Sequence, residues 1–97
     1  MKFKYKISRL ALKDIDSIWT FISQNWSKAQ ANIYFKGVLK QIDLNCKNPE
    51  IGKTIDEVKI GHRLFLFKSH LVIYKIEKEV DLIDRILHQR MDIDSNL

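Results

Sequence analysis

The residues best equipped for chemistry in this sequence are a histidine and three arginines, all in its second half: Arg63, Arg85, His88 and Arg90. A histidine can transfer protons near neutral pH, and an arginine can stabilise a developing negative charge. Such a set could support acid–base catalysis if the fold brought its members together. The same residues could equally bind a target or form structural ion pairs.

Strand parity argues against a joint site that uses both Arg85 and His88. The apolar and β-branched segment that ends at His88 predicts a strand. Side chains alternate between the two faces of a regular strand, so His88 should share a face with Asp84, and Arg85 should point the other way with Ile83 and Leu87. A compact site would need a bulge or a strand end between Arg85 and His88.

The sequence does not indicate a metal centre or a cofactor. His62 and His70 flank a predicted strand, but no short ligand spacing or pair of cysteines accompanies them. Cys46 is the only cysteine and can form no internal disulfide. Its apolar helical surroundings predict a position in the core. We therefore expect no metal site and no cofactor.

Length and composition predict a single folded domain over residues 1–97. The chain is 45% apolar and 30% charged, with three Gly and one Pro, which is typical of a globular protein. No apolar run approaches the roughly 20 residues of a membrane span, and the N-terminal residues alternate between apolar and basic. A cytoplasmic protein without a membrane partner is expected.

Periodicity predicts a strand followed by two helices in the first half of the chain. Apolar and lysine residues alternate over residues 2–7, which indicates a half-buried strand. Ser8 is then a plausible N-cap for a first amphipathic helix that extends to Trp26. Ser27 begins a capping box with Gln30 and opens a second helix that runs to Cys46. Trp26 is expected to pack in the core or at the helix junction.

The second half of the chain predicts a loop followed by three strands. Asn48-Pro49 ends the second helix, and the loop between Gly52 and Gly61 has little apolar content and should be mobile. Residues 63–67, 71–76 and 80–88 are rich in β-branched and aromatic residues and are separated by short polar breaks. The fold class is therefore α+β in the order β-α-α-β-β-β, with a small, mostly antiparallel sheet and a two-helix hairpin on one face. Residues 93–97 are expected to fray unless Ile93 or Leu97 packs against the rest of the domain.

This order of elements resembles the RelE/ParE superfamily of bacterial toxins, and the residues sharpen the resemblance toward ParE. The shared features include Asp14 in the first helix, Asn48-Pro49 followed by Gly52, and Gly61 with Arg63. Most specific is the C-terminal run Arg85-Ile86-Leu87-His88 with Met91-Asp92. The similarity covers residues 3–92.

The resemblance implies the toxin of a type II toxin–antitoxin system that poisons DNA gyrase by binding and is neutralised by a ParD-like antitoxin in a hetero-oligomer. It places the target contacts at the C-terminal end of the chain, where we expect Arg85, His88, Arg90 and Met91 to act. Net charge is +5, and residues 1–47 carry nine basic and three acidic residues. An exposed lysine face of the second helix could therefore attract an acidic antitoxin helix. The expected antitoxin-binding residues are Lys28, Lys36 and Lys40.

The alternative function, also implied by the superfamily, is a ribosome-dependent mRNA endoribonuclease of the RelE type. Its partners would be the ribosome and mRNA, and attack by a ribose 2′-hydroxyl on the adjacent phosphate would require an acid–base group and a cation. The candidates for that chemistry are Arg63, His88 and Arg90. Strand parity and the balanced charge of the loop before Arg63 favour the binding function.

Overall fold

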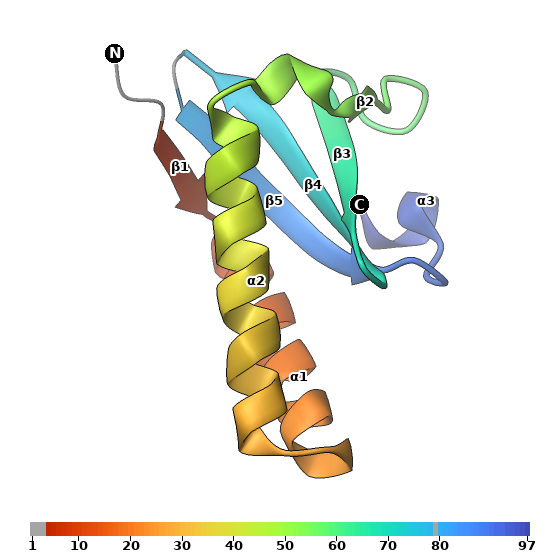
Figure 1. Ribbon diagram of the computed structural model, residues 1–97. Coiled ribbons are helices and arrows are strands. Elements are labelled where there is room, and N and C mark those ends of the chain that lie inside the picture. The colour runs from red at the N-terminus through yellow and green to blue at the C-terminus, as the bar shows by residue number, and fades with distance from the viewer. Residues whose placement is uncertain (1–3, 79) are drawn as a thin grey trace.

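The computed structural model describes residues 4–78 and 80–97, and it contains one sheet with a helical hairpin on one face (Figure 1). The start of the predicted first strand, at residues 2 and 3, lies outside the described residues. The elements in chain order are β1 (Lys4–Ile7), α1 (Arg9–Asn25), α2 (Lys28–Cys46), the 3₁₀ helix η1 (Pro49–Ile51), β2 (Lys53–Thr54), β3 (His62–Phe67), β4 (His70–Glu77), β5 (Val80–His88) and α3 (Ile93–Asn96).

The sheet has the order β1-β5-β4-β3-β2 and confirms the predicted α+β class. Strands β3, β4 and β5 form an antiparallel meander. Strand β1 joins its edge parallel to β5, with Lys4 opposite Val80 and Ile7 opposite Ile83. A parallel neighbour requires a crossover, and the two helices supply it. The sequence analysis did not predict the short strand β2, the 3₁₀ helix or α3.

Both predicted helix starts are confirmed by capping hydrogen bonds. The Ser8 hydroxyl accepts a hydrogen bond from the N–H of Ala11, and the Ser27 hydroxyl accepts one from the N–H of Gln30. Ser8 also donates to the backbone oxygen of Asp84 at 2.7 Å, so the cap ties α1 to the sheet. The two helices lie side by side, and their junction projects beyond the end of the sheet (Figure 1).

The main core fills the space between the helical hairpin and one face of the sheet. Apolar residues of both helices meet alternate residues of the central strands, as half-buried strands require. The fully buried members include Ala11, Val38, Ile42, Val72, Tyr74, Ile83 and Ile86. Cys46 is also buried, in agreement with the prediction.

A β-bulge at Asp84 interrupts the regular alternation of side chains that was predicted for β5. Ile83 and Leu87 therefore do not share a face, contrary to the prediction. Ile73 of β4 pairs with Arg85, but the next residue, Tyr74, pairs with Ile83, which leaves Asp84 as an extra residue. Ile83 therefore packs in the core under the helices, whereas Leu87 packs on the opposite face. The bulge precedes Arg85, so it does not bring Arg85 and His88 to the same face.

A smaller core covers the other face of the sheet and corrects the expectation of a frayed C-terminal tail. Ile55, Ile73 and Leu87 are buried there, and Ile93 and Leu97 of the tail pack against them. The tail forms α3, whose N-cap residue is Asp92. Packing of Ile93 and Leu97 buries apolar surface, and the favourable free energy of this burial opposes fraying of the tail.

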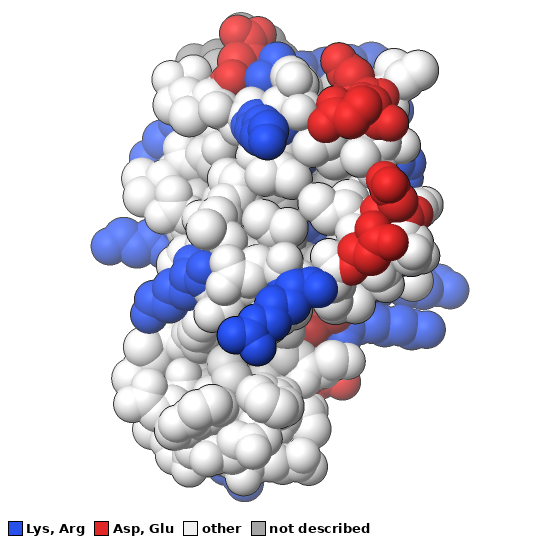
Figure 2. Space-filling view, turned by 90° about the vertical axis from the view of Figure 1, so that its right-hand side faces the viewer, with Lys and Arg blue, Asp and Glu red and all other residues white. Residues whose placement is uncertain are grey.

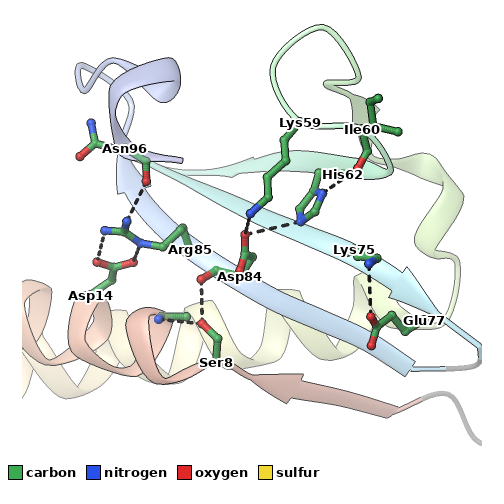
Figure 3. A network of polar contacts seen from close by, with 11 residues as sticks. Ser8, Asp14, Lys59, Ile60, His62, Lys75, Glu77, Asp84, Arg85 and Asn96 are labelled. Carbon is green, nitrogen blue, oxygen red and sulfur yellow. Dashed lines mark hydrogen bonds and ion pairs between the residues drawn. The ribbon is translucent and has the colours of Figure 1, made fainter.

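The segment from η1 to β3 is tied to the sheet rather than extended into solvent. The Arg63 guanidinium donates to the backbone oxygens of Glu50 and Gly52 at 3.0 and 2.8 Å. Lys59 donates to the carboxylate of the bulged Asp84 at 3.0 Å (Figure 3). This segment was expected to be mobile because its sequence is polar, but its polar groups are the ones that anchor it.

Asp81 is a buried carboxyl group whose ionisation should depress stability near neutral pH. It is 2% exposed, and the amide of Asn45 lies 3.4 Å from its Oδ2 atom. Burial raises the pKa of Asp81 to about 6, and the hydrogen bond from Asn45 only partly offsets this effect. Above pH 6 the folded protein must therefore hold a poorly solvated charge.

Replacing Asp81 with asparagine is expected to stabilise the protein by about 2–3 kcal/mol at pH 7.5. The folded-state pKa lies above the unfolded value, so the wild type gains stability as the pH falls from about 6 to about 4, whereas the variant does not. The advantage of the variant should therefore disappear near pH 4. Urea unfolding at several pH values measures this difference, and a gain that stays constant with pH would contradict the assignment.

Candidate functional site

A groove of about 680 Å³ lies between the projecting part of the helical hairpin and the end of the sheet. One wall comes from α1 and the start of α2, and the other comes from the β3–β4 turn and the C-terminal end of β5. Because the hairpin extends past the sheet, this part of the helices has no strand to cover it (Figure 1). The lining is predominantly apolar, as in binding sites for ligands or peptides.

The apolar wall contains large side chains that remain exposed. The exposed fractions are 58% for Phe21, 69% for Trp26 and 59% for Ile33. The rings of Phe21 and Trp26 meet edge to face at 6.0 Å. Trp26 was expected to pack in the core or at the helix junction. It lies at the junction, as the C-cap of α1, but it is exposed and not part of the core. Exposed apolar surface of this kind marks an interaction site.

The charge distribution agrees with a binding surface. Figure 2 shows that the lower part of the molecule, formed by the projecting hairpin, presents almost no charged side chains on this face, whereas Lys and Arg side chains cross its middle. An apolar area bordered by cations suits a partner that is both apolar and acidic.

The polar end of the groove contains two histidines and a tyrosine. His70 begins β4 and pairs with His88 at the end of β5, and their rings lie edge to face at 5.4 Å. The Tyr34 hydroxyl of α2 contacts Nδ1 of His70. Desolvation and the neighbouring His88 lower the pKa of His70. His88 was predicted as a functional residue, whereas no role was predicted for His70 or Tyr34. The register of β4 and β5 brings the two histidines together, and the packing of α2 on the sheet adds Tyr34.

Two of the other predicted target residues lie at this end. Arg90 and Met91 follow β5 and are exposed, and Met91 lines the groove with 42% of its surface accessible. The N–H of Arg90 donates to Nδ1 of His88 at 3.1 Å, so the turn after β5 fixes the ring of His88.

Arg85 forms a structural ion pair rather than part of the groove lining. Its guanidinium donates two hydrogen bonds to the carboxylate of Asp14, at 2.8 and 2.9 Å, and one to the backbone oxygen of Asn96 (Figure 3). The same carboxylate accepts the N–H of Ile86 at 3.0 Å. The hydrogen bonds to Asp14 raise the pKa of Arg85. Arg85 thus joins α1, β5 and the C-terminal tail.

The alternative catalytic set is not brought together. Arg63 pairs with Tyr74, whereas His88 pairs with His70, four residues away along β4. At about 3.3 Å per residue this separates the two positions by about 13 Å along the strand. The Arg63 side chain is also turned toward η1, as its hydrogen bonds show.

The three lysines expected to bind the antitoxin are exposed but lie outside the groove lining. Helix α2 contributes Gln30, Ile33 and Tyr34 to the groove, and Lys28, Lys36 and Lys40 occupy other positions on its surface. No group of three metal-ligating side chains occurs among the residues that the structure describes. Within the same residues, no helix is long and apolar enough to cross a membrane.

A sheet with a parallel edge strand and a helical hairpin on one face is also found in a solved structure. That structure is described as the chromosomal ParDE TA system from P. aeruginosa, and one of its chains has this fold. The TM-score is 0.78 with 16% sequence identity, and the match covers 90% of the present chain and 96% of the other.

The sequence comparisons identify the family. A family model described as the ParE toxin of the type II toxin–antitoxin system parDE matches residues 5–93. Toxin ParE1 of Mycobacterium tuberculosis, strain H37Rv, is 35% identical over 99 residues, with 100% of both chains covered. Toxin ParE1 of Caulobacter vibrioides is 33% identical over 93 residues, with 96% of each covered. The chain therefore belongs to the ParE toxin family of type II toxin–antitoxin systems, as the resemblance predicted.

Proposed function

We propose that this toxin acts in the cytoplasm by binding DNA gyrase, and that a ParD-like antitoxin neutralises it by occupying the groove. The observation that carries this proposal is the position of His88 and Met91, which belong both to the C-terminal target region and to the groove lining. An antitoxin segment in the groove would cover these residues. Neutralisation then follows from occlusion of the target-binding surface in a toxin–antitoxin complex.

The proposed target contacts are His88, Arg90 and Met91, with Arg85 in a supporting role. The first three lie at or just after the end of β5, where side chains are accessible. The guanidinium of Arg85 has a side-chain exposure of 19% and is engaged by Asp14. It therefore contributes by fixing the end of β5 in place. Lys28, Lys36 and Lys40 would accelerate the approach of an acidic antitoxin through long-range attraction.

The test is supercoiling by purified gyrase in the presence of purified toxin. Replacing His88, Arg90 and Met91 together with alanine should lower the inhibitory potency at least about tenfold. A few residues usually carry most of the binding energy of an interface, and a loss of about 1.4 kcal/mol is tenfold in affinity. The matched control replaces Lys36 and Lys40 with alanine, which removes two exposed cations outside this surface and should leave inhibition unchanged.

Mapping of mRNA ends in a translating extract distinguishes the proposal from the alternative function. Intact mRNA together with blocked supercoiling supports the proposal. Codon-positioned cuts with normal supercoiling would replace it with ribosome-dependent endoribonuclease activity.

A further inference from the structure

The two histidines at the polar end of the groove each leave Nε2 available to a ligand. His88 accepts the N–H of Arg90 at Nδ1, so its neutral ring carries the proton on Nε2. His70 is contacted at Nδ1 by the Tyr34 hydroxyl, and its Nε2 is a donor when the imidazole is protonated. Within the part of the chain that the structure describes, neither Nε2 atom has a hydrogen-bond partner.

The surroundings of these rings supply positive charge and no available anion. The Lys68 ammonium, in the turn before His70, lies 5.7 Å from the centre of the Tyr34 ring. Asp14 is the one carboxylate among the described residues that line the groove, and it is already bound by Arg85 and by the N–H of Ile86. The groove therefore offers donors and a cation without an acidic partner for them.

We propose that the polar end of the groove, formed by Tyr34, Lys68, His70 and His88, is a binding site for one carboxylate. This inference rests on the proposed function, since the carboxylate would be an Asp or Glu side chain of the antitoxin segment that fills the groove. Charge complementarity selects this occupant. An amphipathic segment would cover the exposed rings of Phe21 and Trp26 with its apolar side and place an acidic residue against the histidines.

Binding of a carboxylate at this place makes the affinity depend on pH. The pKa of unliganded His70 is lowered by burial and by the neighbouring His88. A bound anion favours the protonated imidazole and raises that pKa, so affinity increases as the pH falls. The other titratable or charged side chains that line the groove are Asp14 of α1, Tyr34 of α2 and Lys68 of the turn. These side-chain types do not ordinarily change charge between about pH 8 and pH 6.

The experiment uses two small probes that differ only in charge, 4-phenylbutyrate and 4-phenylbutanamide, with the purified full-length toxin. NMR follows the imidazole Cε1–H resonances of His70 and His88 during each titration. We expect the acid to shift both resonances and to raise the pKa of His70. Its affinity should increase up to about tenfold between pH 8 and pH 6 for each pKa unit gained. The amide should bind more weakly and with no dependence on pH.

Matched variants separate a specific site from the general attraction of a cationic protein. Replacing His70 or His88 with glutamine should abolish the pH dependence and the preference for the acid. Replacing Lys53 of β2 with glutamine removes an exposed cation outside the groove and should preserve both. Equal binding of the two probes, no binding of either, or an equal loss in the Lys53 variant would overturn the proposal.

Different results would show that the carboxylate site is wrong and that the groove is not the antitoxin site. If a co-expressed ParD-like antitoxin rescues growth and Trp26→Ala abolishes the rescue, the groove is the antitoxin site. Should the probes nevertheless bind alike, the carboxylate site is wrong and the groove assignment stands. If the antitoxin rescued cells with the Trp26 variant as well as cells with the wild type, the groove would not be the antitoxin-binding site.

Discussion

The replacement of Asp14 by alanine is expected to lower the free energy of unfolding by about 3 kcal/mol. Its side chain is 15% exposed and forms two hydrogen bonds with Arg85, which is 19% exposed. Removing one partner of a mostly buried ion pair leaves the other charge poorly solvated, and this typically costs about 3–5 kcal/mol. The N–H of Ile86 would also lose its acceptor.

Urea denaturation measures the change, and Asp16→Ala is the matched control. Asp16 lies on the same helix but is exposed, so its removal should change stability by no more than about 0.5 kcal/mol. Arg85→Ala and the double variant complete a thermodynamic cycle, in which the two losses should be strongly non-additive. If Arg85→Ala abolished toxicity but left stability unchanged, Arg85 would be a target contact and not a structural residue.

Gly52→Ala is the second substitution with a large expected effect, again about 3 kcal/mol of destabilisation. A Cβ atom at this position would lie 2.0 Å from Oη of Tyr74 and 2.8 Å from its Cζ atom. The tyrosine cannot move aside, because it is 0% exposed and its hydroxyl donates to the backbone oxygen of Pro49. The backbone of Gly52 has φ −60°, so the cost comes from the collision alone.

Two further variants test this explanation by thermal unfolding. Gly52→Ala combined with Tyr74→Phe should lose less stability than the sum of the single changes, since the phenylalanine lacks the nearest colliding atom. Gly37→Ala is the control: its Cβ would lie 2.8 Å from Cζ of Phe67, the end of a partly exposed ring that can shift. Alanine also gains about 1 kcal/mol of helix propensity there. A large loss at Gly37 and none at Gly52 would contradict this account.

Local patterns in the sequence were sufficient to predict most of the fold. Alternation in residues 4–7 and the three- and four-residue periodicity after Ser8 depend only on which side of an element faces the core, and both were confirmed. The serine caps depend on hydrogen bonds three residues away. The run of residues 80–88 predicted a strand because it is rich in apolar and β-branched residues between short polar breaks.

The groove and its polar end could not be predicted in the same way. Whether Trp26 is buried depends on how far the helices extend past the sheet, which is a property of the assembled fold. The pairing of His70 with His88 depends on the register of two strands, and that register is shifted by the bulge at Asp84. The ion pair between Asp14 and Arg85 joins residues 71 positions apart. No local pattern encodes such a distance.

The parallel pairing of β1 with β5 also determines when the protein can fold during its synthesis. Residues 4–7 hydrogen-bond with residues 80–83, so the first strand made has to wait for nearly the last. The ion pair of Asp14 and the docking of Leu97 likewise need the end of the chain. Contacts between such distant segments slow folding. A growing chain on the ribosome therefore cannot complete this sheet until residues 80–83 have been made and can pair with β1.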